Sequence, residues 1–257
     1  MSGPGAFVLL DAPTELSPSR ISDALAARHP DVPIVIPPLD DGGSTKATLL
    51  NISGSIVVLM QFDAPLPDGW QGAASRAMIH WPEAEAVFAR HRAHIIVSIM
   101  GESENRLWIA RVVTAVVGAL VASHAKCSAV LWDLTVANSS QVFAELSRSA
   151  FAPYPDFPSA LWVSTNPFQD PDSLIVVMTI GLSNFIGREI ELEAQASQLE
   201  ALLTTARGVA TYLLQDGVEL REGETIGASA TERIPVRFME SRRFEGLPVI
   251  AASLSSI

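Results

Sequence analysis

The stretch that most constrains the fold is residues 173–195, SLIVVMTIGLSNFIGREIELEAQ. Residues 174–179 predict a buried strand because residues 174–178 are all apolar, and Gly181 and Gly187 predict a tight corner after it. Residues 189–193 then alternate glutamates with aliphatic residues, the period of a strand with one face in the core and one in water. The stretch therefore predicts two strands joined by a short corner, with its glutamates on a solvated face.

The order of the predicted elements indicates an α+β fold. Ser53-Gly54-Ser55 predicts a hairpin, Ser17 and Pro18 predict a helix start, and Ser139 or Asn138 predicts a helix cap. The predicted strands are residues 7–10, 47–52, 56–62, 94–100, 129–133, 160–164, 174–179, 188–194, 234–239 and 248–254, and the helices are residues 17–28, 83–92, 104–123, 141–149 and 198–215. In the first half, strand, helix, strand, strand, helix, strand is the order of the split βαβ unit of ferredoxin-like folds.

We therefore expect two ferredoxin-like halves with mainly antiparallel sheet packed by helices. The expected boundary separates residues 1–126 from residues 127–257. The two halves are expected to pack closely, and a single domain remains an alternative. No sequence repeat relates them.

Composition limits the classes of ligand. With 48% hydrophobic and 18% charged residues the chain can bury a large core, and its net charge of −11 disfavours nucleic acid and anionic membrane surfaces as ligands. Its single cysteine, Cys127, excludes an internal disulfide and a multi-cysteine metal site. The N-terminal residues lack a signal-peptide pattern, and the longest apolar run, residues 112–122, is short for a bilayer span. We expect a cytoplasmic protein.

The sequence motifs give little support for a metal site or a cofactor site. His80, His91 and His94 lie close together with Glu83 and Glu85, but the H-E-x-x-H pattern of zinc enzymes is absent. We interpret the histidines as residues at helix ends and predict no metal and no cofactor.

Asp133, Thr135 and Asn138 follow a strand end, where α/β proteins often bind ligands, although helix capping is the preferred role of Asp133. The G-x-S-x-G motif and the glycine-rich phosphate loops are absent, which disfavours Ser183 as a nucleophile. Cys127 is expected to pack as a small hydrophobic residue. The motifs thus disfavour an enzyme without excluding one.

One motif carries a family resemblance. T-x-G-L-x-x-F-x-x-x-E-I-E, running from Thr179 to Glu191 with Phe185 at its centre, resembles an uncharacterised bacterial family of unknown function. Supporting segments are WPEAEAVFARHRAHIIV, AVLWD and DGVELREGETIG. The resemblance implies a cytoplasmic α/β protein, with members sometimes noted near secretion and toxin loci, and it implies no catalytic residue.

These observations favour a non-enzymatic protein-binding module, most concretely an immunity protein that neutralises a basic bacterial toxin. An acidic surface steers association with basic partners. The residues expected to contact the partner are Asp40, Asp41, Glu189, Glu191 and Glu193.

Two alternatives stay open. One is a small-molecule-binding protein or hydrolase-like enzyme with a cleft near Asp133 and Ser183. The other is a subunit of an oligomeric scaffold, because the high apolar content suits buried surface between subunits. A homo-oligomer is compatible with either reading.

Overall fold

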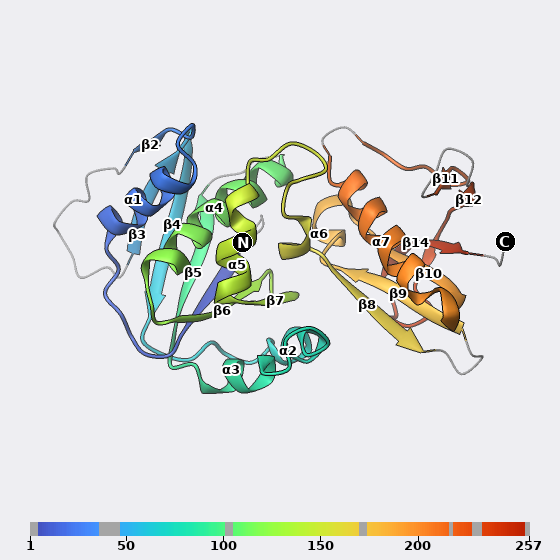
Figure 1. Ribbon diagram of the computed structural model, residues 1–257, viewed down its shortest axis with the longest axis horizontal. Helices are drawn as coiled ribbons and strands as arrows, with labels where there is room; N and C mark the ends of the chain where they lie inside the picture. Colours follow the sequence, from blue (N-terminus) through green and yellow to red (C-terminus); the bar gives the residue numbers. More distant parts are fainter. Residues whose placement is uncertain are drawn as a thin grey trace. The chain divides into compact units, whose positions relative to one another are not determined.

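The computed structural model describes residues 5–35, 47–100, 105–169, 174–215, 218–227 and 233–254. The chain forms two compact units, Met1–Leu161 and Trp162–Ile257 (Figure 1). Both contain helices and mainly antiparallel sheet, so the expected α+β class is confirmed.

The first unit is built on a seven-stranded antiparallel sheet with the order β2-β3-β4-β5-β1-β6-β7. Its strands are β1 (Ala6–Leu10), β2 (Ile34–Val35), β3 (Ala47–Ile52), β4 (Ser55–Phe62), β5 (Ala93–Met100), β6 (Cys127–Trp132) and β7 (Val136–Ser139). Strands β5 and β6 both pair antiparallel with β1. The connection from β5 to β6 therefore joins two parallel strands with β1 between them, one split βαβ unit. β5 also separates β4 from β1, and this strand order does not confirm the expected ferredoxin-like halves.

Helices α1 (Pro18–Arg28), α4 (Arg106–Ser123) and α5 (Ser140–Leu146) form one layer on this sheet. Their starts are capped by Ser17, Asn105 and Ser139, whose side chains accept backbone hydrogen bonds from the first turn. Among the described residues, α4 is the one helix long and apolar enough to cross a bilayer, and 72% of it is buried inside the protein.

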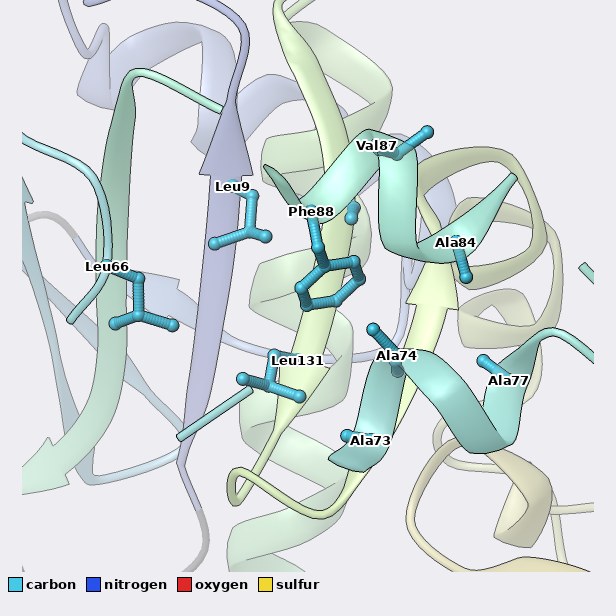
Figure 2. Packing of buried hydrophobic residues seen from close by; sticks show 11 residues of the cluster. Leu9, Leu66, Ala73, Ala74, Ala77, Ala84, Val87, Phe88 and Leu131 are labelled. Atoms are coloured by element: carbon cyan, nitrogen blue, oxygen red, sulfur yellow. The ribbon is translucent and has the colours of Figure 1, made fainter. Parts of the chain in front are cut away.

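Two short helices, α2 (Gln71–Ala77) and α3 (Ala84–Arg90), lie on the opposite side of the sheet. Their alanines and Phe88 pack on Leu9 of β1 and Leu131 of β6, as Figure 2 shows. Leu66, from the segment that leads into α2, closes one side of this cluster. The cluster therefore covers β1, β6 and β7.

The second unit holds a five-stranded sheet with the order β13-β14-β10-β9-β8. Its strands are β8 (Ser164–Gln169), β9 (Leu174–Ile180), β10 (Glu189–Gln195), β13 (Arg237–Glu240) and β14 (Pro248–Ser253). Helix α7 (Leu199–Leu213) packs on β8, β9 and β10 (Figure 1), and β10 pairs parallel with β14. The short helix α6 (Ser183–Ile186) follows β9, and β11 (Thr225–Ile226) and β12 (Ile234–Pro235) form a separate two-stranded ribbon.

The boundary between the units lies after Leu161 and not after residue 126. The reason is strand pairing, because β6 pairs with β1 along its length and β7 pairs with β6. Residues 127–139 therefore complete the first sheet.

A close helix contact gives the first testable prediction. A Cβ on Gly118 of α4 would lie 2.0 Å from Ser147 Oγ and 2.6 Å from Ser147 Cβ. Gly208 of α7 has open space at the same position. We expect Gly118→Ala to lower the free energy of unfolding by about 1–3 kcal/mol through overpacking. The matched Gly208→Ala should raise it by about 0.5–1 kcal/mol, because alanine favours a helix. Urea denaturation of both variants checks this, and a stable Gly118→Ala protein would contradict it.

Buried histidine gives the second prediction. Burial, followed by Arg28 and Arg148, lowers the pKa of His29 from 6.5 to about 4. The unfolded chain therefore binds a proton between these pH values that the folded chain does not. Stability supplied by neutral His29 is full above pH 6.5 and is lost as the pH falls toward about 4. His29→Phe keeps the edge contact with Phe151 and should flatten this part of the stability-against-pH curve. Equal slopes in both proteins would contradict the assignment.

Candidate functional site

His91 and His94 form hydrogen bonds with other parts of the chain and do not face a common ligand. The backbone N–H of Leu66 donates to His91 Nε2 at 2.7 Å, so this nitrogen carries no proton, and Nδ1 donates to the Phe88 carbonyl. His94 stacks on Phe62 and pairs through Nδ1 with the Ala64 carbonyl at 2.8 Å. Burial lowers the pKa of His94. Both side chains therefore fix residues 64–66 against the sheet.

The third histidine, His80, is exposed at the end of α2. Within the described ranges, no three His, Cys, Asp or Glu side chains are grouped so that they could hold a metal ion.

Asp133 lies in the turn between β6 and β7 and does not cap the following helix, which corrects the prediction. Asp133 and Leu134 have positive φ angles of 45° and 59°, as a tight hairpin turn requires. Asp133 Oδ1 accepts a hydrogen bond from the backbone N–H of Gly5 at 2.6 Å. The cap of α5 is Ser139. Asp133 therefore ties the start of the chain to the hairpin.

Glu189 is the most heavily hydrogen-bonded acid of the second unit. Its side chain is only 2% exposed, and the backbone N–H groups of Gly181, Leu182 and Ser183 donate to its carboxylate at 2.8–3.1 Å. The hydroxyls of Thr179 and Ser183 donate as well, at 2.7 and 2.8 Å. Glu189 thus fastens the corner between β9 and β10 by satisfying donors that the turn leaves free.

The strand predicted at residues 188–194 is confirmed as β10, but the expected solvated glutamate face is wrong. Glu189 and Glu191 are buried, and Glu191 accepts a hydrogen bond from Ser241 Oγ at 2.6 Å. Glu193 is a third exposed and lies 3.8 Å from Arg242. Ser241 and Arg242, which precede β14, thus contact this face of the strand. Asp40 and Asp41 lie outside the described residues.

The expected cleft residues fall in different units, Asp133 in the first and Ser183 in the second. Ser183 Oγ donates to Glu189, and all five histidines precede residue 125, so the second unit has no imidazole base for it. Burial raises the pKa of the Cys127 thiol to about 12, which keeps it protonated. These three side chains therefore serve the fold.

The structure also contains an exposed apolar sheet face that the sequence analysis did not predict. Side chains of directly opposed residues point to the same side of a sheet. Leu9, which packs against α2 and α3, is opposite His94 of β5, and His94 is opposite Phe62 of β4. Phe7 likewise pairs with Ile96, and Ile96 with Met60. The side of the sheet that carries α2 and α3 therefore continues over β5, β4 and β3.

Apart from Asn51, Ser98 and His94, that side of these strands is apolar, and it is only partly covered. We call it the open face, and its members are Val35, Leu49, Ile56, Val58, Met60, Phe62, Ile96 and Met100. Val35 is 60% exposed, Met100 59%, Phe62 41% and Ile56 38%, and the other four are half-buried. On the opposite side of the same strands Leu50, Val57 and Leu59 are fully buried.

The positions of these residues show why the open face is unusual. An antiparallel sheet with one face in water normally alternates apolar and polar residues. Here Val35, Ile56 and Met100 lie in one row across the sheet with Asn51 as the single polar member, and the row contains no charge. A contiguous exposed apolar patch of a few hundred Å² is often functional.

A signal for the open face is present in the sequence. The run SIVVLMQF of β4 is apolar at both odd and even positions. Such a run indicates a strand apolar on both faces, whereas the hairpin prediction used only its turn residues. Neither the run nor the turn shows how much of each face the rest of the chain covers.

Fold and surface together define an α+β protein that leaves one apolar sheet face open. The family model of a domain of unknown function (DUF4261) matches residues 178–251, from the end of β9 into β14. The expected similarity to an uncharacterised family is thereby confirmed for this part of the second unit. No curated protein and no solved structure matches the chain.

The carboxylate of Glu189 gives a third prediction. In Glu189→Gln the amide nitrogen would face hydrogen-bond donors, so we expect the free energy of unfolding to fall by about 1–3 kcal/mol. Hydrogen exchange of the β9 and β10 amides should accelerate correspondingly. Glu193→Gln is the matched control on the same strand, and a change within about 0.5 kcal/mol is expected there because exposed ion pairs contribute little. An equal fall in the free energy of unfolding in both variants would contradict the larger contribution assigned to the hydrogen bonds of Glu189.

Proposed function

We propose that the protein is a non-enzymatic, cytoplasmic protein-binding module that uses the open face of its first unit. The observation that carries the proposal is the row of exposed apolar side chains across β2, β4 and β5. Burying such side chains on a partner contributes favourable free energy at about 25 cal/mol per Å² of apolar surface.

The hydrogen bonds of the polar side chains favour a binding protein over an enzyme. His91, Asp133, Ser183 and Glu189 each make hydrogen bonds that hold two parts of the chain together. Most of their partners are backbone groups of nearby loops and turns, so these bonds satisfy donors and acceptors that the folded chain would otherwise bury unpaired. Their arrangement is therefore better explained by stability than by chemistry.

The partner favoured by charge is a basic protein. A net charge of −11 raises the rate of encounter with positively charged proteins and suppresses encounter with acidic ones. In its most specific form the proposal is an immunity protein that neutralises a basic bacterial toxin. Glu193 keeps a role as a secondary contact because its side chain is partly exposed, whereas the buried Glu189 and Glu191 do not.

Partner capture with matched variants tests the proposal. Ile56→Lys combined with Met100→Lys places two charges on the open face at exposed positions, so folding should be retained. Tyr212→Lys is the control, because Tyr212 is an apolar side chain of α7 with similar exposure, 49%. We expect a protein that the native chain and the control retain from host cytoplasm to be lost by the double variant.

The captured protein is then purified, and its Kd for the three chains is measured by calorimetry. The expected result is at least about a tenfold rise in Kd for the double variant alone. A partner that binds all three chains equally would refute the use of the open face.

A further inference from the structure

We infer that the occupant of the open face is a single amphipathic helix of a partner protein, with an aliphatic side against the sheet and basic residues flanking it. This inference rests on the proposed protein-binding function and specifies its partner. The grounds are the size of the face, the layer it belongs to and the charge around it.

The size of the face decides between a helix and a second copy of the chain. From Ile56 to Phe62 the face is about 20 Å long, at about 3.4 Å per residue. The three long strands of the face, β3, β4 and β5, lie about 4.8 Å apart and with their side chains give a width of about 14 Å, and the two-residue β2 adds only Val35 at one edge. The footprint of about 300 Å² is well below the roughly 800 Å² that each partner buries in a stable complex of standard size. Two copies meeting only through this face would bury too little surface to overcome the repulsion between two net charges of −11, whereas a basic helix is attracted.

A helix fits the same dimensions. An α-helix with its side chains is about 10–12 Å wide, and a length of 20 Å corresponds to about 13 residues. The rows of the open face offer side chains for such a helix to pack on, with Val58 and Met60 half-buried at the centre. Helices that bind in this way present apolar residues at positions i, i+3, i+4 and i+7.

The sheet already carries helices in this layer. Helices α2 and α3 cover β1, β6 and β7 on the same side, and Figure 2 shows them packed on Leu9 and Leu131. His94 and its contact with Ala64 mark where that cover ends and the open face begins. A helix from a partner would extend the layer over β3, β4 and β5, which is the usual way that a sheet face is buried.

Charge sets the flanks of the helix. The open face itself has no charged member, and the exposed Asp63 directly follows Phe62 at one end. The exposed Asp31 precedes β2 at the edge of the sheet. A helix with lysine or arginine beside its aliphatic stripe gains from these acids and from the net charge of −11, whereas an acidic helix is repelled.

A designed peptide tests the inference with the full chain. The probe is a fluorescein-labelled 15-residue peptide, about the length of the face, with leucines on one helical side and lysines and alanines elsewhere. A second peptide has the same composition with the leucines scattered around the helix, and a third has glutamate in place of lysine. Fluorescence anisotropy should show saturable binding of the first peptide and much weaker binding of the other two.

The open-face variants locate the binding. Ile56→Lys with Met100→Lys should raise the Kd of the first peptide at least about tenfold, and Tyr212→Lys should leave it unchanged. Val35→Lys, at the most exposed position, is a second variant in case the first does not fold, and it should also weaken binding.

Three outcomes would overturn the inference. Equal binding of the scattered peptide would show a general attraction of charges. Failure of the first peptide to bind would exclude a helix of this type. Sedimentation of the native chain as a dimer that the double variant dissociates would identify a second copy as the occupant. None of these outcomes decides the proposed function, which is judged separately by capture and calorimetry of a natural partner.

Discussion

The pairing of β1 on both of its edges is the constraint on which the first unit depends. Val8, Leu9 and Leu10 are fully buried, and β1 forms antiparallel ladders with β5 on one side and β6 on the other. Because β5 and β6 then run parallel, the chain must cross from one to the other over a face of the sheet. It does so in α4, which is consequently buried on nearly every side.

The same topology explains why one face stays open. Helix α4 has 18 residues and is about 27 Å long, so with α1 it can cover most of a seven-stranded sheet about 30 Å wide. On the other side the connection from β4 to β5 supplies α2 and α3, which have 7 residues each and a length of about 10 Å. Two such helices cover β1, β6 and β7. The strands beyond them keep an apolar surface that these two helices are too short to reach.

The sequence predicted most elements but not how their surfaces are used. Turn residues and helix caps act locally, so the hairpin at Gly54 and the cap at Ser139 were predictable from a few neighbours. The glutamates of β10 were misplaced because alternation cannot reveal that Gly181, Leu182 and Ser183 present their N–H groups to Glu189. The open face was missed because an apolar strand reads the same whether a helix covers it or not. Both errors concern tertiary contacts that no periodicity encodes.

An open apolar face and a strongly acidic chain are complementary features. Apolar area provides affinity without choosing a partner, and on a neutral protein it would also favour association with copies of itself. A net charge of −11 makes two copies repel one another over about a Debye length, roughly 8 Å at physiological salt. The small footprint of the face adds too little to overcome that repulsion. A basic partner is instead attracted to the same acidic protein. Charge therefore selects a basic partner over a second copy, which the apolar open face alone does not do.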